Sequence, residues 1–337
     1  MKRQRVLVLM HPDLVPPDSR EGHSDQEADL WKTEYDVVTT LRGLGHEVRA
    51  LGVQDELHPV REAIETWKPT VVFNLLEEFH RNVLYDQNVV SYLELLQVPY
   101  TGCNPRGLVI ARSKALSKKL LAYHRIRVPA FAVFPLRRAV RRPRRLPFPL
   151  IVKSLTEHAS LGISQASVVD SDEKLAERVA FVHERLRTDA IAEQFIEGRE
   201  YYVSLIGNDR LLALPVWELA FENMPANAAL IATAKVKHDV EYQKRRGIFQ
   251  RVAENLPEGM AQKIVQTSKR IYRLLELDGY ARIDYRLGDD GTLYFLDANP
   301  NPEIAESEEL AMAAKHVGMT YPELLTRVIG LGLRRSA

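Results

Sequence analysis

A hairpin near the C-terminal end of the chain carries the side chains that are best suited to chemistry. The stretch Asp278–Pro302 predicts two short strands, 281–287 and 292–298, because both runs are rich in β-branched and aromatic residues and flank a Gly-Asp-Asp-Gly turn. Side chains alternate between the two faces of a strand. One face gathers Arg282, Asp284, Asp297 and Asn299, and the other gathers Ala281, Ile283, Tyr294, Leu296 and Ala298.

The length of the turn sets the expected register of the hairpin. A four-residue loop brings the two strand ends next to it face to face. The expected pairs across the strands are Leu287 with Thr292, Arg282 with Asp297, and Asp284 with Phe295.

Three oxygen-bearing side chains beside an arginine suit a magnesium-dependent reaction of a phosphate. Mg²⁺ takes a few carboxylate or amide oxygens and completes its shell with water and substrate phosphates. An arginine beside the metal stabilises negative charge on a transferring phosphoryl group. The alternative is a solvent-facing hairpin with a surface ion pair, since charged strand faces are common.

Two lysines occupy positions that suit the binding of a phosphate chain, one at a helix start and one at a strand end. Lys114 follows Ser113, which can cap a helix over 113–124, and Lys153 lies at the end of a predicted strand, 150–154. A helix N-terminus favours anions, and a lysine there adds a positive charge. Between the two lysines, the small polar run 158–162 lets backbone N–H groups approach phosphate. It has no Walker pattern, and most lysines are simply solvated, so each signal is weak alone.

Length and composition are typical of a soluble globular protein with two or three domains: the chain has 337 residues. Its 46 Lys and Arg against 45 Asp and Glu leave a formal charge of +1, which does not favour nucleic acid or an anionic membrane as a partner. The single Cys103 excludes an intramolecular disulfide and is expected to be buried. The first apolar run, Val6–Met10, is too short for a signal peptide and no run could span a membrane, so a cytoplasmic protein is expected.

Strands and helices alternate in the first expected unit, residues 1–103. Alternation of this kind predicts a parallel sheet. The expected strands are 5–10, 46–51, 70–76 and 98–101, and the expected helices are 31–44, 56–67 and 88–96, with a loop over 11–29.

Two smaller units are expected after the first. The unit 104–188 contains six arginines in the run 137–147, and no aromatic residue is interleaved with them, so we interpret this run as a solvated loop rather than a nucleic-acid surface. The unit 189–337 contains the hairpin and a loop-rich, lysine-bearing segment, 220–247, which is expected to be a flexible cover. Its expected helices are 257–275, 307–317 and 321–331, the last with Thr320 and Glu323 spaced as a capping box.

Six short runs occur in an order found in one enzyme family. They are VVFNLLE, LELLQVPYTGCNP, the helix that starts at Lys114, IVKS, IAEQFIEGRE and the hairpin run ARIDYR…YFLDANPNP. Each run is modest, but the ordered set spans almost the whole chain and resembles the D-alanine–D-alanine ligase group of the ATP-grasp superfamily. The resemblance implies an ATP-grasp fold, of class α/β with α+β lobes, behind an N-terminal Rossmann-like domain with a parallel sheet.

The resemblance implies that the chain binds ATP. It assigns Glu193 to the adenine amino group and Glu200 to the ribose hydroxyls, and it puts Lys235, or alternatively Lys237, at the terminal phosphates. The residues implied to bind the nucleotide are Lys114, Lys153, Ser160, Glu193, Phe195, Ile196, Glu200 and Lys235.

The resemblance also implies Mg²⁺ as two ions, with Mn²⁺ as an alternative metal. Asp284 and Asn299 each hold one ion, Asp297 bridges the two, and Arg282 is the catalytic residue that faces the transferring phosphoryl group. The bridging residue of the family is usually a glutamate. Asp297 is one methylene shorter, which leaves the number of metals open.

The half of the site that binds amino acids in this family departs from the family pattern. A glycine-rich run after the first strand is missing, and Glu21 and Glu27 are candidate replacements for its glutamate. Glu77 replaces a histidine, and Pro302 lacks the N–H that the turn after the metal asparagine would supply. The expected substrate residues are Glu77, Glu303 and Glu308, whose carboxylates favour a cationic substrate, with ordinary surface acids as the alternative.

The activity implied by the resemblance is that of an ATP-dependent carboxylate–amine ligase. A substrate carboxylate attacks the γ-phosphate of ATP, and an amine then displaces phosphate from the acyl phosphate to form an amide or peptide bond. The partners are then a small amino acid, an amine or a short peptide, and a homodimer is left open. The alternatives are D-alanine–D-alanine ligation itself, an ATP-binding phosphotransferase and a non-catalytic ATP-grasp protein.

Overall fold

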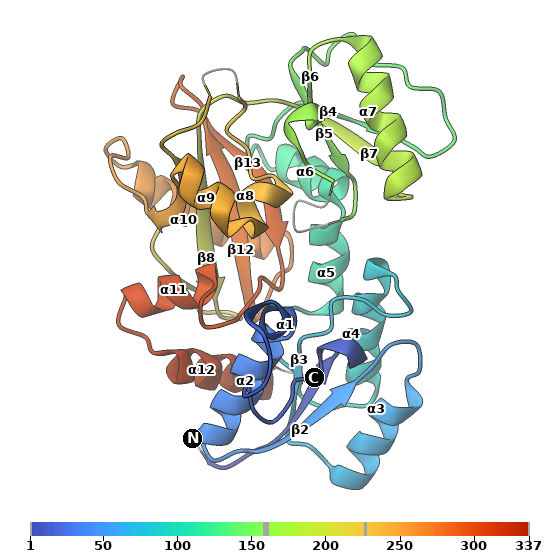
Figure 1. Ribbon diagram of the computed structural model, residues 1–337, viewed down its shortest axis with the longest axis vertical. Coiled ribbons are helices and arrows are strands. Elements are labelled where there is room, and N and C mark those ends of the chain that lie inside the picture. Colours follow the sequence, from blue (N-terminus) through green and yellow to red (C-terminus); the bar gives the residue numbers. More distant parts are fainter. Residues whose placement is uncertain (1, 158–161, 226–227, 336–337) are drawn as a thin grey trace.

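The strands of the protein form three separate sheets. The computed structural model describes residues 2–157, 162–225 and 228–335. The sheet of the N-terminal part lies at one end of the molecule, and the two other sheets lie next to each other at the opposite end (Figure 1). No helix within the described residues is long and apolar enough to cross a membrane.

The first sheet is parallel, as predicted, with the strand order β2-β1-β3. Five successive residues of its central strand are buried, a continuous apolar run typical of strands that are covered on both faces. The fourth predicted strand is reduced to one parallel bridge between Val72 and Tyr100. The elements of this part are β1 (Arg5–Met10), α1 (Asp25–Leu30), α2 (Lys32–Gly43), β2 (Glu47–Gly52), α3 (His58–Glu62), β3 (Val71–Asn74) and α4 (Asp86–Leu95).

The segment expected as a loop before α2 contains a helix of its own. Ser24 caps α1 by accepting a hydrogen bond from Glu27 N, and the Glu27 carboxylate accepts one from Ser24 N at 2.8 Å. This reciprocal capping box was visible in the sequence as Ser-x-x-Glu, but the prolines before it favoured a loop.

The second sheet is antiparallel, with the order β4-β7-β5-β6, and α7 packs on it through Leu175, Val179 and Val182. Helix α5 was not predicted, although Asn104 caps it and Pro105 occupies its first turn, an arrangement typical of a helix start. The elements are α5 (Pro105–Arg112), α6 (Lys114–Tyr123), β4 (Phe131–Phe134), β5 (Leu150–Ser154), β6 (Val168–Val169), α7 (Asp172–Arg185) and β7 (Ala190–Gln194).

The boundaries between the expected units remain predictions. The position of β7 is relevant to the boundary after residue 188. This strand begins after residue 188 and pairs with β4 and β5. A division after residue 188 therefore separates β7 from the sheet that it joins. A short 3-10 helix, Gln165–Ser167, leads directly into β6.

The third sheet is antiparallel, with the order β11-β10-β8-β12-β13, and a short β9 lies beside β8. Helix α10 covers it, because Ile264 and Ile271 pack in one core with Val203 and Ile283. The elements are β8 (Arg199–Ile206), β9 (Leu212–Ala213), β10 (Trp217–Phe221), α8 (Ala234–His238), α9 (Val240–Arg246), β11 (Ile248–Val252), α10 (Met260–Leu274), β12 (Tyr280–Leu287), β13 (Leu293–Asn299), α11 (Glu309–His316) and α12 (Tyr321–Leu333).

The last helix returns to the N-terminal sheet. Leu324 and Val328 of α12 are buried in one core with Val6, Val8 and Phe73 of the first sheet. The predicted capping box of α12, formed by Thr320 and Glu323, is confirmed. This docking fixes the N-terminal end of α11 close to the first part of the chain (Figure 1).

The expected register of the β12–β13 hairpin was wrong. Arg282 lies opposite Asn299, and Asp284 lies opposite Asp297. Between Asp284 and Tyr285 the register shifts by one residue, so β13 carries a bulge. A bulge places two residues of one strand against one of the other, which the length of the turn does not reveal.

The bulge also changes which residues of β13 face the core. Phe295 packs with Ala281 and Ile283 in the apolar core, whereas Leu296 lies on the wall of a cavity. Tyr294 pairs with Arg286, which lines the same cavity, so the expected apolar face was wrong for Leu296 and Tyr294. The face expected to be polar is present, since Arg282, Asp284, Asp297 and Asn299 all line the cavity.

Candidate functional site

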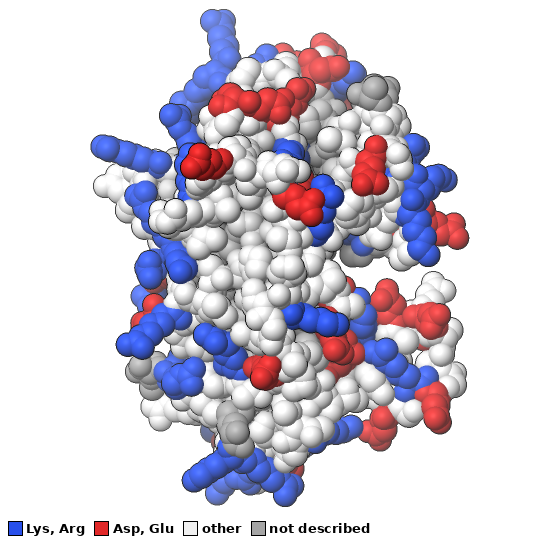
Figure 2. Space-filling view, turned by 90° about the vertical axis from the view of Figure 1, so that its left-hand side faces the viewer, with Lys and Arg blue, Asp and Glu red and all other residues white. Residues whose placement is uncertain are grey.

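A cavity of about 1070 Å³ lies where the three parts of the chain meet. Its wall includes Glu77 from the first part, Lys153 and Glu193 from the second sheet, and Arg282 and Asp284 from the third. Acidic and basic side chains are scattered together over the face of the molecule in Figure 2, so local groups in this cavity, not the overall charge, decide what it binds.

Lys114 is held at the start of α6 in a buried position. Ser113 caps the helix, and the Lys114 Nζ lies 2.6 Å from the carbonyl oxygen of Glu157 and 3.8 Å from Asp297 Oδ2. Burial, together with the charges of Lys153 and Lys118, lowers the pKa of Lys114 against the opposing effect of Asp297. An anion bound beside this ammonium group would therefore relieve an unfavourable charge.

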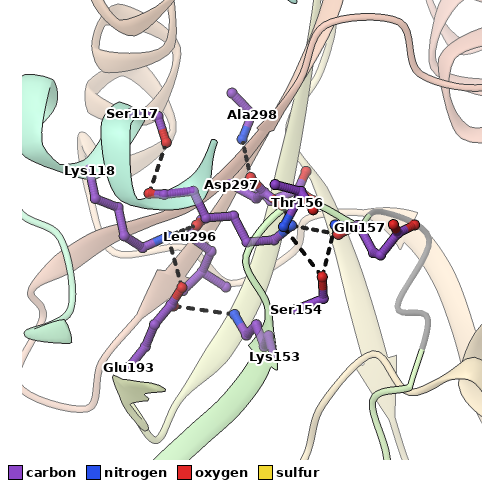
Figure 3. A network of polar contacts seen from close by, with 12 residues as sticks. Ser117, Lys118, Lys153, Ser154, Thr156, Glu157, Glu193, Leu296, Asp297 and Ala298 are labelled. Atoms are coloured by element: carbon purple, nitrogen blue, oxygen red, sulfur yellow. Dashed lines mark hydrogen bonds and ion pairs between the residues drawn. The ribbon is translucent and has the colours of Figure 1, made fainter. Parts of the chain in front are cut away.

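Glu193 joins two lysines in the interior (Figure 3). Its two carboxylate oxygens lie 3.1 Å from Lys118 Nζ and 3.2 Å from Lys153 Nζ, and only 1 % of the residue is exposed. Burial alone would raise the pKa of Glu193, but the two lysine charges lower it, so the carboxylate stays ionised. Lys118 also donates a hydrogen bond to the carbonyl oxygen of Leu296, at the bulge of β13.

Lys118 thus connects the end of β7 with the strand that carries Asp297. Sequence reasoning missed this residue, although it follows Lys114 by four positions and so lies on the same face of α6. Both Glu193 and Lys153 line the cavity. The expected contact of Glu193 with adenine remains a prediction.

The segment after β7 forms a second corner of the cavity. Phe195 and Ile196 line the wall, as does Glu200 at the start of β8. Glu200 is held in place because Tyr202 Oη donates to it at 3.1 Å and Arg286 Nη1 lies 3.4 Å away. Arg286, a further residue that sequence reasoning missed, also lies over the Phe195 ring at 5.6 Å. These contacts preorganise a carboxylate beside an apolar slot, as a nucleoside would require.

Asp284 and Asp297 face each other across neighbouring strands, and Asn299 follows on the same strand and face. The Asn299 side-chain oxygen accepts a hydrogen bond from Asn301 N at 3.2 Å, which fixes the amide. Two carboxylates and an amide oxygen on one face are a donor set suited to Mg²⁺ or Mn²⁺. The residues present therefore fit the expected metals.

Arg282 is buried between two carboxylates. Its Nε lies 2.8 Å from Asp284 Oδ1, and its Nη1 pairs with Glu309 at the N-terminal end of α11. Gln250 donates a hydrogen bond to the other oxygen of Glu309. Burial opposes the charge of Arg282, but Asp284 and Glu309 together raise its pKa. Glu309 was missed because nothing in the sequence links it to a residue 27 positions earlier.

The cover segment contains two short helices, α8 and α9, which lie in front of the third sheet (Figure 1). Val236, Lys237, Val240 and Gln243 line the cavity. Burial raises the pKa of Asp284, and Lys237 is near enough to oppose this rise, whereas Lys235 is exposed and does not belong to the wall. Of the two lysines considered from the sequence, Lys237 is therefore the one on the cavity wall, near Asp284.

All three glutamates that were expected to bind substrate line the cavity. Glu303 accepts a hydrogen bond from Thr33 Oγ1 at 2.9 Å, and Glu308 lies 2.8 Å from Lys32 Nζ. Glu77 also lies on the wall of the cavity, and the side chains of Glu77 and Glu303 are exposed. Asp86 and Arg112 form an ion pair on the same wall.

Besides Lys235, three expected residues do not contribute to the described wall. Ser160 lies outside the described residues. Glu21 and Glu27 are exposed, and neither lines the cavity, since Glu27 caps α1 instead. In the region of α1 and α2, the side chains of Asp29 and Lys32 line the cavity instead.

Comparisons by sequence and by structure both find D-alanine–D-alanine ligases among the proteins similar to this chain. The family model described as "D-ala D-ala ligase C-terminus" matches residues 121–330. A curated D-alanine–D-alanine ligase of Aquifex aeolicus is 30% identical over 326 residues, which cover 96% of this chain and 99% of that one.

Two solved structures share the fold over nearly their whole length. The D-alanine–D-alanine ligase of Bacillus anthracis complexed with ATP has a TM-score of 0.74 and 22% identity, and the match covers 98% of both chains. The D-Ala:D-Ser ligase of Enterococcus faecalis has a TM-score of 0.70 and 17% identity, covering 98% of this chain and 100% of the other.

Proposed function

The chain belongs to the D-alanine–D-alanine ligase family of ATP-grasp enzymes, and on that basis we propose that it uses ATP to join an amino-acid carboxylate to an amine. It is an ATP-dependent ligase with the ATP-grasp fold. A carboxylate oxygen of the substrate attacks the γ-phosphorus of ATP and ADP leaves. The amine then attacks the acyl carbon, phosphate leaves, and the amine nitrogen gives up a proton.

The observation that carries this proposal is the single cavity shared by phosphate-binding cations and metal-binding oxygens. Lys114 and Lys153 supply positive charge at one side, and Asp284 and Asp297 supply carboxylates at the other. Lys114 lies 3.8 Å from Asp297, so a phosphate chain that reaches the lysine also reaches the carboxylate face. Glu200 and Phe195 would hold the nucleoside, and Lys237 would reach the terminal phosphates.

Asp284, Asp297 and Asn299 would hold the Mg²⁺ that accompanies ATP in this family. Bound there, Mg²⁺ would neutralise charge on the phosphates during transfer. Arg282, on the same face, would stabilise the charge of the transferring phosphoryl group and of the tetrahedral intermediate. Asp297 is a shorter carboxylate than the family's usual glutamate, and the proposal holds for one ion or two.

Catalysis by this site would rest on positioning and charge stabilisation. The lysines and Arg282 are fixed by buried ion pairs before substrate arrives, so little reorganisation is needed at the moment of reaction. The thiol of Cys103 takes no part in this chemistry, since Cys103 is fully buried and does not line the cavity, and burial raises the pKa of its thiol.

The identity of the two substrates is open to direct measurement. D-alanine is the substrate in the names of the relatives, and the D-Ala:D-Ser ligase shows by its name that this fold serves a second amino acid as well. We propose a small amino acid as the carboxylate donor and test the amine donor separately. Because the reaction consumes ATP, we propose a cytoplasmic enzyme, and size-exclusion chromatography decides whether it is a homodimer, which the sequence leaves open.

The test is release of ADP and phosphate with pairs of amino acids and amines, together with mass spectrometry of the products. An amide product formed in step with ADP supports the ligase. ADP release with a stable phosphorylated product and no amide would instead indicate a phosphotransferase. ATP binding without ADP release from any pair would indicate a non-catalytic protein.

A further inference from the structure

The guanidinium of Arg282 is surrounded by three side chains that determine where it points. Its Nε lies 2.8 Å from Asp284 Oδ1 and its Nη2 lies 3.0 Å from Asp284 Oδ2, so one carboxylate holds one edge of the group. Its Nη1 pairs with the carboxylate of Glu309. The guanidinium carbon lies over the ring of Tyr202 at 5.0 Å, which covers one face.

Glu309 is itself held by segments other than the hairpin that carries Arg282. It is the first residue of α11, where the helix N-terminus favours a carboxylate. Gln250 on β11 donates a hydrogen bond to Oε1 of Glu309, and Arg282 contacts the other oxygen, Oε2. The next residue, Leu310, is buried in the same core as Val37 of α2. The carboxylate of Glu309 is therefore a fixed point beside the guanidinium.

The three charged side chains are largely shielded from water. Arg282, Asp284 and Glu309 are 13 %, 15 % and 14 % exposed, and all three line the cavity. Ion pairs with so little exposure are weakly screened, so the loss of one partner strongly affects the other. Burial alone would lower the pKa of Arg282, and the charges of both carboxylates raise it.

The two carboxylates differ in what else they are expected to bind. Asp284 belongs to the metal-binding face of the hairpin, and metal binding would leave less of its negative charge for the guanidinium. Glu309 lies on α11, away from that face of the hairpin. Its charge therefore stays available to Arg282 when Asp284 engages a metal.

The contacts of Arg282 leave part of its guanidinium for the reaction. Its Nε–H and one Nη2–H go to Asp284, and one Nη1–H goes to Glu309. Within the described residues, one N–H on each terminal nitrogen is left, and such a pair suits the oxygens of a phosphoryl group. Rotation of the guanidinium would move both N–H groups, so the contact at Nη1 determines where they point.

We propose that Glu309, supported by Gln250, is a positioning residue that holds Arg282 in place for the transferring phosphoryl group while Asp284 engages the metal. This inference rests on the proposed ligase function and adds a residue to the same site. Glu309 acts through Arg282 and not by contact with a substrate. Its replacement should therefore slow the chemical step and leave the binding of ATP and of the amine donor unchanged.

The kinetic test compares Glu309→Gln with Glu306→Gln in the full chain. Both changes remove a negative charge and keep the side-chain shape, and Glu306 is the matched control because it is exposed and does not line the cavity. In Glu309→Gln, kcat for ADP release should fall about ten- to a hundredfold, the effect of one charge-assisted hydrogen bond. In Glu306→Gln it should stay at the parent value, as should KM for ATP and for the amine donor in both variants.

A double-mutant cycle tests whether Glu309 acts through Arg282. When Glu309→Gln is added to Arg282→Gln, the single-turnover rate should not fall further, because no guanidinium is left to position. Glu309→Asp should restore part of kcat, since it returns the charge on a shorter side chain. Gln250→Ala removes the support of Glu309 but keeps the ion pair, so it should lower kcat by a smaller factor.

A binding measurement gives a second readout that needs no turnover. Orthovanadate bound together with ADP and Mg²⁺ imitates the transferring phosphoryl group, and the free N–H groups of Arg282 would contact it. Calorimetry should show about tenfold weaker binding of vanadate to Glu309→Gln, with the affinity for ADP unchanged. The affinity for ADP also shows that the nucleotide site is folded, and if Glu309→Gln lost it, Gln250→Ala would decide by the same measurements.

The results separate this inference from the proposed function. A higher KM for the amine donor with kcat unchanged would overturn the inference and make Glu309 a substrate-binding residue. A full additional loss in the double variant, or vanadate affinity equal to that of Glu306→Gln, would overturn it as well, and the ligase function would stand in each case. Failure of the parent protein to release ADP with any donor pair would overturn the ligase function, and the binding of vanadate would still decide whether Glu309 positions Arg282.

Discussion

Asp284 lies directly opposite Asp297 across β12 and β13, in a register that a bulge changes immediately after this pair. Two like charges directly opposite in a sheet are destabilising unless cations offset them. Here Arg282 contacts Asp284, and Lys114 lies 3.8 Å from Asp297. Basic groups therefore offset the charge of the pair. A bound metal would instead engage the two carboxylates, and a phosphate chain would engage Lys114.

Replacement of Asp297 by Asn should remove most turnover while the fold is retained. A neutral amide has almost the shape of the carboxylate, but it binds a divalent cation poorly. The measurement is ADP release with the best donor pair, together with the melting temperature. Asp289→Asn is the matched control, since Asp289 is exposed in the turn of the same hairpin. Turnover near that of the control would contradict the metal assignment.

Removal of either phosphate-side lysine should weaken ATP binding. Lys114→Ala and Lys153→Ala each delete a cation from the nucleotide side of the cavity, and at about 1.5–3 kcal/mol per charge-assisted hydrogen bond the affinity falls about ten- to a hundredfold. Calorimetry with ATP and Mg²⁺ measures this loss. Lys119→Ala serves as the control, because Lys119 is exposed on the same helix. If both variants bound ATP as the control does, the phosphates would have to lie elsewhere.

Lys118→Met should destabilise the protein as well as weaken ATP binding. The substitution leaves Glu193 fully buried with one cation instead of two, and breaking a buried ion pair costs about 3–5 kcal/mol. It also removes the donor to Leu296 O at the bulge that sets the position of Asp297. Urea unfolding should show the loss of stability, and Lys119→Met should not. Equal stability of the two variants would show that Lys118 is dispensable.

The parts of the site that the sequence predicted depend on local patterns. The capping of α6 by Ser113, the strand that ends near Lys153 and the polar face of the hairpin each follow from a few adjacent residues. The polar face survived the wrong register because the bulge lies beyond Asp284 and leaves the alternation of the last residues of β13 unchanged.

The parts that the sequence did not predict depend on contacts between distant segments. In the sequence, Glu34 and Glu309 look like ordinary helix residues. The charges that act on Glu34 come from the segments after β3 and β13, which are distant in the sequence. Arg282 meets Glu309 only because α12 docks on the first sheet and so fixes α11. The hydrophobic periodicity of one segment carries no information about contacts between segments that are distant in the sequence.

The cover segment should become protected from protease when nucleotide binds. Lys244, Arg245 and Arg246 end α9, and the cations of this segment repel one another until an anion arrives. Trypsin should therefore cut at 244–246 more slowly in the presence of a non-hydrolysable ATP analogue and Mg²⁺. The arginines at 137–145 provide an internal control, because several of them are exposed in a loop away from the cavity. Equal protection at both places, or at neither, would count against a closing cover.

The folding stability should depend on pH through Glu34, which lies on α2 and is buried. Burial, with the charges of Glu77 and Glu303, raises the pKa of its carboxyl to about 7 in the folded protein, against 4.5 for an unperturbed glutamate. Between these values the folded state holds a proton that the unfolded state has released. Stability contributed in this way is present at low pH and is lost as the pH rises toward 7. Above that pH the folded chain carries an additional charge beside Glu77 and Glu303.

Glu34→Gln should remove this pH dependence, because the amide stays neutral. The shift from 4.5 to about 7 corresponds to about 3 kcal/mol, so the variant should be more stable than the parent protein by up to that amount at about pH 9 and nearly equal to it at about pH 4. Urea unfolding at both pH values measures the difference, with Asp36→Asn as control, because Asp36 is the other acid on α2 and pairs with Arg20. A variant that changed stability equally at the two pH values would show that Glu34 titrates as an ordinary carboxyl group.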